Sequence, residues 1–308
     1  MNAITVTDLT KHYGTVEAIN GLNFSVATGE LFGFIGPDGA GKTTLFRILT
    51  TLLVPDSGRA AILGLNVVND FKSLRLRIGY MPGRFSLYQD LTVEENLKFF
   101  ATIFGTTVRE NYDLIKDIYA QIEPFRDRRA GKLSGGMKQK LALSCALIHK
   151  PDVLFLDEPT TGVDAVSRRE FWEMLKRLQA RGITIVVSTP YMDEAGLCDR
   201  VALMQKGRLL GIDSPAAIVG RYSRPLWAVK GANRHDVLIH LRHNEHAHRV
   251  YPFGEYLHYT DRRDTVRSED IRTYLEKLGC NGVEVKPAQP NIEDCFMELM
   301  EQDSHAAS

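Results

Sequence analysis

The sequence predicts an α/β protein built on a mixed, mostly parallel sheet, with a smaller α/β part towards the C-terminal end. Two continuous apolar runs, residues 31–35 and 153–156, have the length and composition of strands buried on both faces of a parallel sheet. Segments with helical apolar spacing separate the strand-like runs, and this alternation is typical of a sheet covered by helices. The 308 residues suffice for one large and one small domain.

The first domain is expected to span residues 1–220. Its strands are indicated by short apolar or alternating runs that end at turn residues. These runs are residues 4–9, 22–26, 31–35, 60–63, 78–81, 153–156, 183–187 and 201–204, the last of which we expect to be the final strand of this domain. The first two predict an N-terminal antiparallel part. A helical insert is expected at about residues 91–147, and the capping-box pattern of Thr92 and Glu95 marks the start of its first helix.

The second domain is expected to span residues 221–308. Its strand-like and helical segments follow in the order βαββαβ, which suggests a ferredoxin-like arrangement. Asn291 is the expected cap of a closing helix, whose apolar face runs from Ile292 to Leu299. The residues after this helix are expected to form a disordered tail.

A glycine-rich segment, GPDGAGKTT, directly follows the first buried run. It fits the pattern G-x-x-x-x-G-K-[ST] and is followed by a helical pattern. Its residues are Gly36, Pro37, Asp38, Gly39, Ala40, Gly41, Lys42, Thr43 and Thr44. Between a strand and a helix, the amides of such a loop and the positive helix end bind phosphate groups. We therefore expect the chain to bind a nucleoside triphosphate, with Lys42 at the terminal phosphates and the Thr43 hydroxyl on a magnesium ion.

Two acidic residues, Asp157 and Glu158, follow the second buried run. The carboxyl end of a central strand is where open α/β sheets place their ligands. Without the upstream phosphate loop we would interpret these residues as a cap of the next element. With it, we expect Asp157 to bind Mg²⁺ and Glu158 to orient or deprotonate the attacking water.

Composition argues against several other classes of protein. Lysine plus arginine and aspartate plus glutamate both number 38, so net charge indicates neither nucleic acid nor anionic lipid as a partner. The 4 cysteines are widely spaced, as is typical of a reducing compartment. We find no apolar run near the roughly 20 residues that span a bilayer, and no signal-peptide pattern. We expect a cytoplasmic protein, or one bound to a membrane through a partner.

The histidines between residues 235 and 248 fit no metal-ligand motif and are interpreted as solvated surface.

The segment LSGGMKQK at residues 133–140 resembles the signature motif of ATP-binding-cassette (ABC) ATPases. It lies between the phosphate loop and the Asp157–Glu158 pair, as in that family, and PTTGVD at residues 159–164 is similar to the family's D-loop. Tyr13 falls where the family has an adenine-stacking aromatic residue, with Val16 as its neighbour, although a lone aromatic residue can equally be a packing residue. The resemblance covers about residues 1–220.

The resemblance implies ATP and Mg²⁺ as ligands, and a dimer. In the family, two cassettes pair head to tail, so Ser134, Gly135 and Gly136 of one chain would close on the γ-phosphate held by the other, with Asp164 at the same interface. ATP would join the subunits and hydrolysis would release them. The end of the chain, PNIEDCFMEL, resembles cassettes that serve ABC-2-type exporters. We therefore expect an ATPase subunit, in a homodimer or heterodimer, on the inner face of the cell membrane beside a separate permease.

Two positions depart informatively from the family pattern, and Asp38, where the family usually has asparagine, is a smaller departure. The family has a glutamine after the segment IGYMP, where this chain has Gly83, and a histidine after Ser188 and Thr189, where this chain has Pro190. Proline has no side-chain hydrogen-bonding group. These changes are either neutral or slow hydrolysis, so the alternative function is a slowly or non-hydrolysing, ATP-gated regulatory cassette. A soluble cassette of translation or DNA repair would normally carry two cassettes or a long coiled-coil insert, and we find neither.

Overall fold

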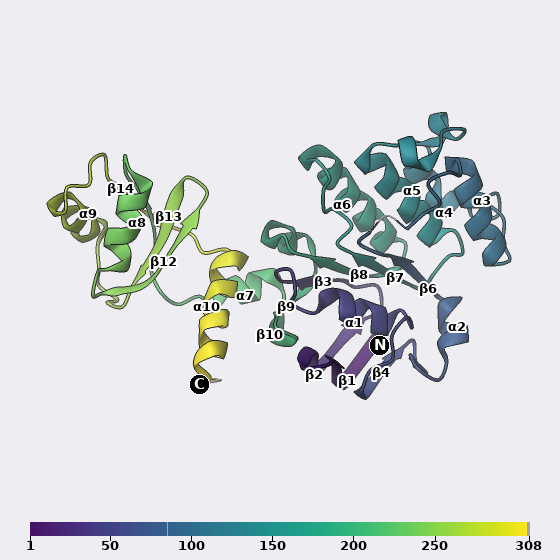
Figure 1. Cartoon of the computed structure of the whole chain (residues 1–308), viewed down its shortest axis with the longest axis horizontal. Helices are drawn as coiled ribbons and strands as arrows, with labels where there is room; N and C mark the ends of the chain where they lie inside the picture. The colour runs from purple at the N-terminus through teal and green to yellow at the C-terminus, as the bar shows by residue number, and fades with distance from the viewer. Residues whose placement is uncertain (85, 307–308) are drawn as a thin grey trace. The chain divides into compact units, whose positions relative to one another are not determined.

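The computed structural model describes residues 1–84 and 86–306; for residues 303–306 it describes the backbone alone. The chain forms two compact units (Figure 1). One unit comprises Met1–Pro215 together with the end of the chain from Glu298, and the other comprises Ala216–Met297. The boundary expected from the sequence is at about residue 220, with the end of the chain in the second domain.

A six-stranded sheet forms the centre of the first unit. Its order is β10-β9-β3-β8-β7-β6, in which β10 is antiparallel to β9 and the other neighbours are parallel. The strands are β3 (Leu31–Ile35), β6 (Ile78–Met81), β7 (Val153–Asp157), β8 (Thr184–Thr189), β9 (Arg200–Gln205) and β10 (Arg208–Asp213). The two predicted central strands, β3 and β7, are buried at every residue. The prediction that the domain's strands end near residue 204 was wrong, because β10 pairs with β9 as a half-exposed edge strand with little apolar signal.

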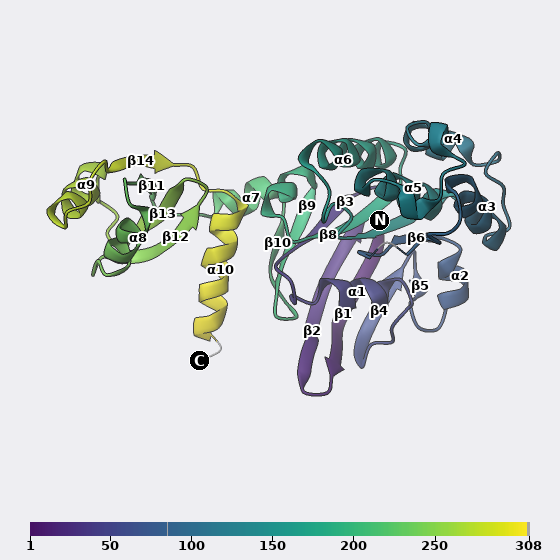
Figure 2. The ribbon, with the colours of Figure 1, turned by 45° about the horizontal axis from the view of Figure 1, so that its top comes forward.

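A four-stranded antiparallel sheet, with the order β2-β1-β4-β5, forms the second layer of this unit (Figure 2). Its strands are β1 (Asn2–Tyr13), β2 (Val16–Ala27), β4 (Ser57–Ile62) and β5 (Leu65–Asn66). One apolar core joins this sheet to the central sheet. Within it, the ring of Phe34 packs against those of Phe24 and Phe46 at centroid distances of 5.1 and 6.0 Å. The core holds the loop after β3 between the two layers.

The helices of the first unit include a group that packs together as a helical insert. The structure confirms the helical insert, in which α5 packs against α3 and α4 (Figure 1). The helices are α1 (Lys42–Leu49), α2 (Phe71–Arg75), α3 (Val93–Ile103), α4 (Tyr112–Tyr119), α5 (Gly135–Leu147) and α6 (Ala165–Ala180), with short 3-10 turns η1 (Glu123–Phe125), η2 (Ala130–Lys132) and η3 (Met192–Leu197). Helix α7 (Pro215–Gly220) begins at the last residue of this stretch and belongs mostly to the second unit. The predicted capping box is also confirmed, since the Thr92 hydroxyl accepts the N–H of Glu95 and the Glu95 carboxylate accepts the N–H of Thr92.

The second unit has the predicted ferredoxin-like topology. Its elements are β11 (Leu226–Lys230), α8 (Arg234–Arg242), β12 (Ala247–Phe253), β13 (Tyr256–Asp261), α9 (Ser268–Lys277) and β14 (Glu284–Ala288). The strand order β12-β13-β11-β14 is antiparallel throughout, as in the ferredoxin-like βαββαβ arrangement. Side chains of α8 and α9 share one apolar core with the sheet, including Val237, Leu275 and Tyr259.

The closing helix α10 (Ile292–Ala306) begins where the sequence predicts and is capped by Asn291, which accepts the N–H of Asp294 at 3.1 Å. Asp294 is fully buried and accepts hydrogen bonds from Tyr251 Oη and from His258 Nδ1, the latter at 2.6 Å. The residues after Leu299, expected to be a disordered tail, continue α10 as far as Ala306. Residues 307 and 308 lie outside the described residues.

Candidate functional site

The phosphate-loop segment, residues 36–44, joins β3 to the first turn of α1, and its backbone requires glycine at two positions. A Cβ at Gly36 would overlap the carbonyl oxygen of Met204 on the neighbouring strand β9. Gly41 has a φ of +103°, which side chains oppose, and a Cβ there would overlap the carbonyl oxygen of Ala18 on β2. The loop is therefore packed between β9 and β2.

Lys42 begins α1, and its side chain folds back over the loop. The residue is 3% exposed. Its Nζ donates hydrogen bonds to the carbonyl oxygens of Gly36 at 2.7 Å and Pro37 at 2.9 Å, and it lies 3.3 Å from Glu158 Oε1. These acceptors hold a buried positive charge at the centre of the loop. Of the other loop residues, Ala40 is buried, Thr43 and Thr44 are half-buried, and Asp38 and Gly39 are exposed.

The two acidic residues at the end of β7 lie beside the loop. Asp157 is buried, and its Oδ1 accepts hydrogen bonds from Ser188 Oγ at 2.6 Å and from Thr43 Oγ1 at 3.3 Å. The N–H of Glu158 donates to Ser188 Oγ at 3.0 Å, and Glu158 has a φ of +50°, a strained backbone conformation for a residue other than glycine. Pairing of β7 with β8 thus puts Ser188, which the sequence analysis did not single out, between the two acidic residues.

A cavity of about 440 Å³ opens at this edge of the sheet. It is lined by Thr43, Asp157 and Glu158 and by Arg47, Tyr80 and residues 82–84. Burial, with the charge of Asp157 as a second cause, raises the pKa of Tyr80 well above its ordinary value, so the phenol is neutral. The cavity therefore offers hard oxygen ligands together with cationic side chains.

The signature residues lie at the start of α5. Ser134 is the N-cap, and its Oγ accepts a backbone N–H at 3.4 Å. Gly136 packs against Ser167 of α6, where a Cβ would lie 2.9 Å from the Ser167 hydroxyl, and Gly135 faces the carbonyl oxygen of Gly162. These three residues therefore lie beside the loop that precedes α6, and none of them lines the cavity described above.

The D-loop residue Asp164 is the N-cap of α6. Its Oδ1 accepts the N–H of Ser167 at 3.0 Å. Hydrogen bonds from the Ser167 backbone and side chain hold the pKa of Asp164 below its ordinary value, so the carboxylate stays charged.

Tyr13 and Val16 pair across the end of the β1–β2 hairpin, next to the two-residue turn that contains Gly14. The residues are 47% and 61% exposed, so the structure does not support Tyr13 as a core residue. Ala18 follows Val16 by two residues on β2, and its carbonyl oxygen packs against Gly41 of the phosphate loop. The end of the hairpin is therefore separated from this contact by only two residues of β2.

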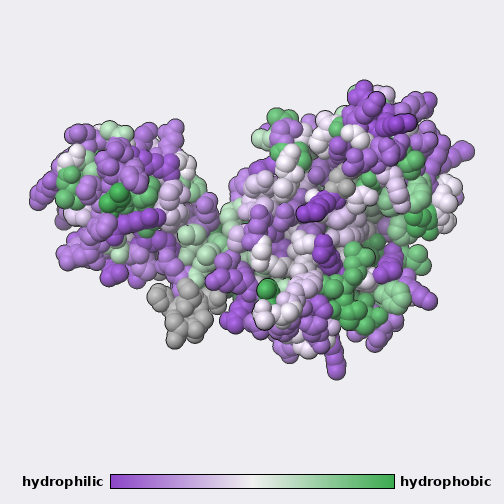
Figure 3. All heavy atoms as spheres, in the orientation of Figure 1, coloured by the Kyte–Doolittle hydropathy of each residue, from purple (hydrophilic) through white to green (hydrophobic). Residues whose placement is uncertain are grey.

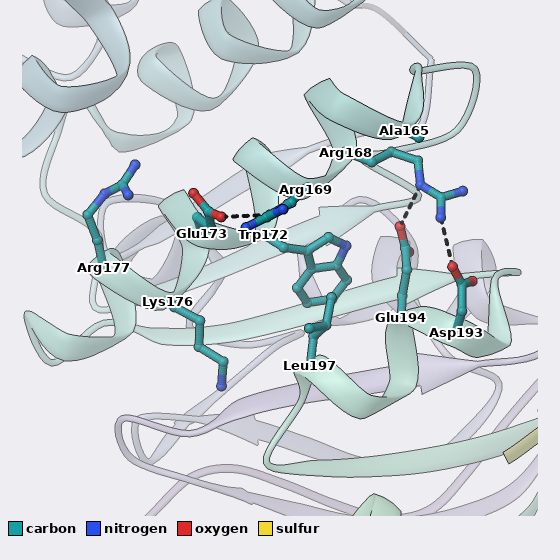
Figure 4. Close-up of a pocket in the computed structure, with 10 residues that line it drawn as sticks. All are labelled: Ala165, Arg168, Arg169, Trp172, Glu173, Lys176, Arg177, Asp193, Glu194 and Leu197. Carbon is teal, nitrogen blue, oxygen red and sulfur yellow. Dashed lines mark hydrogen bonds and ion pairs between the residues drawn. The ribbon is translucent and has the colours of Figure 1, made fainter. Parts of the chain in front are cut away.

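The turn after β8 contains Pro190 and is braced by residues that the sequence analysis missed. Thr189 Oγ1 donates to Glu194 Oε2 at 2.5 Å and accepts the N–H of Tyr191 at 3.1 Å. Arg168 of α6 reaches Glu194, with 3.6 Å between Nε and Oε1 (Figure 4), and its guanidinium lies 4.5 Å from the centroid of the Tyr191 ring. No local sequence pattern predicts these contacts of Arg168, because α6 and the turn meet only in the folded structure.

A glycine loop between a central strand and a helix, with a buried lysine beside strand-end carboxylates, defines the class of P-loop nucleoside triphosphatases. A family model described as "ABC transporter" matches residues 19–161. The Nod factor export ATP-binding protein I of Rhizobium sp. (strain N33) is 38% identical over 301 residues, which cover 96% of each chain. This chain therefore belongs to the ABC transporter family and is one of its ATPases.

Two further comparisons agree with this family. The probable multidrug ABC transporter ATP-binding protein YbhF of Escherichia coli (strain K12) is 42% identical over 214 residues, which are 69% of this chain and 37% of that protein. The chain thus matches a little over a third of the length of YbhF. The solved structure of cbiO1 from Clostridium perfringens, part of the ABC transporter complex cbiONQ, superposes with a TM-score of 0.64 at 28% identity, over 71% of this chain and 91% of that chain. In the described part of this chain, no helix is both long and apolar enough to cross a membrane.

Proposed function

We propose that this chain binds and hydrolyses ATP and thereby drives export through a separate membrane permease. The observation that carries the proposal is the meeting of the phosphate loop with the strand-end carboxylates. Lys42 Nζ lies 3.3 Å from Glu158, and Thr43 Oγ1 lies 3.3 Å from Asp157. The names of the relatives, a Nod factor export protein and a probable multidrug transporter protein, support export as the direction of transport.

Each of these residues has a role that fits its contacts. The loop amides and Lys42 bind the phosphates. The Thr43 hydroxyl and the Asp157 carboxylate are hard oxygen ligands that suit Mg²⁺, which supplies charge neutralisation when bound. Glu158 is half-buried at the cavity and acts as the base that orients or deprotonates the attacking water. The exposed ring of Tyr13, with Val16, offers an apolar surface on which adenine stacks.

The signature segment supports a dimer as the working unit. The backbone N–H groups at the start of α5, near Ser134, Gly135 and Gly136, form an anion site that does not share the cavity of its own phosphate loop. A second cassette, identical or different, brings its ATP to this site, and exposed Asp164 faces the same partner. ATP binding closes the dimer and hydrolysis opens it.

An apolar groove is the proposed docking site of the permease. It has a volume of about 390 Å³ and is lined by residues that include Leu52, Leu76, Met81, Phe100, Ile103 and Phe104. Leu52, Leu76 and Ile103 are 58%, 62% and 58% exposed, and Figure 3 shows hydrophobic side chains gathered on the face beside α2 and β6. The groove borders Met81, two residues before Gly83, so a partner here can respond to the nucleotide cavity. The chain is then cytoplasmic and is held on the inner face of the membrane by this partner.

Ile103→Glu tests this docking site, because the residue is exposed and the charge is placed in the groove. The tagged chain should co-purify with a multi-spanning protein from detergent extracts of its native membranes, and the substitution should lower recovery of that protein about tenfold. The control is Val68→Glu, which also places a charge at an exposed apolar residue but lies outside the groove. Equal recovery with both variants would place the permease elsewhere.

The alternative function, a slowly hydrolysing regulatory cassette, is supported by Gly83 and Pro190. Gly83 lines the cavity but offers no side chain to magnesium or water. Pro190 offers no hydrogen bond to a γ-phosphate. Electrostatic groups around a transferring phosphoryl group commonly contribute several kcal/mol to catalysis, so losing two of them predicts slow turnover.

Restoring both side chains, with Gly83→Gln and Pro190→His, should raise the steady-state rate of ATP hydrolysis about tenfold or more. A Cβ at residue 83 would lie 3.0 Å from the carbonyl oxygen of Asp157, so the backbone must move by a few tenths of an ångström, and Pro190→His alone is the matched control. An unchanged rate in both variants would show that these positions do not limit hydrolysis.

A further inference from the structure

The cavity beside the phosphate loop contains two arginines to which the family resemblance assigns no role. Arg47 lies on α1 and Arg84 directly follows Gly83, and both line the cavity together with Thr43, Asp157 and Glu158. Both arginines are exposed. Among the described residues, neither guanidinium has an ion pair, a hydrogen bond or an aromatic partner.

The carboxylates of the cavity already have partners. Glu158 is 3.3 Å from Lys42 Nζ, and Asp157 accepts hydrogen bonds from Ser188 and Thr43. Arg47 and Arg84 in the lining, together with Lys42 beside Glu158, supply three positive charges against the two negative charges of Asp157 and Glu158, which leaves one positive charge. A site with surplus cations and spare N–H donors attracts an anion with several oxygens, and a guanidinium binds phosphate in a fixed two-pronged geometry.

The chain passes close to the end of β7 at Gly83, directly before Arg84. A Cβ at Gly83 would lie 3.0 Å from the carbonyl oxygen of Asp157, closer than an unstrained side chain allows. The chain therefore runs close to the end of β7 at this point, and Arg84 is the first residue after it with a long polar side chain at the cavity. Arg84 thus directly follows Gly83, which has no polar side chain.

We propose that Arg84 is a catalytic residue that contacts the γ-phosphate of ATP and supplies the polar contact that Gly83 and Pro190 do not. Arg47 adds to the positive potential on the same side. This inference rests on the proposed function, since it requires ATP in the phosphate loop. Its consequence is selectivity: Arg84 should favour a nucleoside triphosphate over the diphosphate, because only the triphosphate has the group that it contacts.

The test is equilibrium binding of two nucleotides to the full chain, measured by titration calorimetry with Mg²⁺. The probes are AMP-PNP, a non-hydrolysable ATP analogue, and ADP. Arg84→Ala should weaken AMP-PNP binding about tenfold and change ADP binding less than about twofold, because one charge-assisted hydrogen bond at an exposed position is lost. Arg84→Lys should restore part of the difference, since it keeps the charge but loses the fork geometry.

Two further variants make the result decisive. Arg59→Ala, at an exposed arginine on β4 away from the cavity, is the control for a general loss of positive charge and should bind both nucleotides as the parent does. If Arg84→Ala changes AMP-PNP and ADP binding equally, or changes neither, the assignment of Arg84 is overturned while the ATP site stands. If Lys42→Ala leaves both affinities unchanged, the phosphate loop is not the site, and the proposed function fails together with this inference.

Discussion

Replacement of Glu158 by glutamine should lower ATP hydrolysis by two to three orders of magnitude while ATP binding is retained. A positioned general base contributes about 10²- to 10⁴-fold to a reaction, and glutamine keeps the shape of the side chain without its basicity. The substitution also removes the negative charge 3.3 Å from Lys42 Nζ, so the affinity for ATP should stay equal or rise. Phosphate release under steady-state conditions and nucleotide binding measured side by side provide the check.

The same variant separates the two proposed functions. If the parent chain hydrolyses ATP and Glu158→Gln does not, Glu158 is the base even with Gly83 and Pro190 in place. The variant should then form an ATP-dependent dimer that persists, which size-exclusion chromatography with multi-angle light scattering would detect. If the parent chain turns over no faster than the variant, the chain is a regulatory cassette or requires its partner for hydrolysis. Glu173→Gln on the surface of α6 is a control for loss of a carboxylate away from the site.

The second large effect concerns the stability of the second unit. Asp294→Ala should lower the free energy of unfolding of this unit by about 3 kcal/mol, because it leaves the buried Tyr251 hydroxyl and the buried His258 imidazole without their shared acceptor. The chain offers a local probe, since one of its 2 tryptophans, Trp227, lies on β11 of this unit. Urea unfolding followed by Trp227 fluorescence in a Trp172→Phe background reports on the second unit alone.

The same carboxylate makes this stability depend on pH. Burial by itself raises the pKa of Asp294, but hydrogen bonds from His258, Tyr251 and the N–H of Asn291 outweigh it, so the folded pKa lies below the ordinary value. The stabilising contribution is therefore present above about pH 4 and is lost as the pH falls through the lower, folded pKa. Between about pH 4 and pH 2, Asp294→Asn should lose less stability than the parent chain, whereas the exposed Asp264→Asn should follow the parent. Parallel curves for all three chains would contradict this linkage.

Local patterns in the sequence were sufficient for most of the elements. The continuous apolar runs predicted β3 and β7 because a strand buried on both faces has no alternation to obscure it. Thr92 with Glu95, and Asn291 before α10, marked helix starts because capping depends on residues three positions apart. β10 was missed because an edge strand with half-exposed side chains carries little apolar signal.

The sequence by itself therefore determined the phosphate loop, the acidic pair, the signature segment and the order of elements in the second unit, since each is encoded in contiguous residues. Only the tertiary structure decided that Ser188 joins Asp157 to Glu158, that Arg47 and Arg84 line one cavity, and that Asp294 meets Tyr251 and His258. These residues are 31 or more positions from their partners in the Ser188–Asp157 and Asp294 contacts. Such contacts depend on which strands become neighbours in a sheet, and that order is set by the burial of the whole core, not by any local run of the chain.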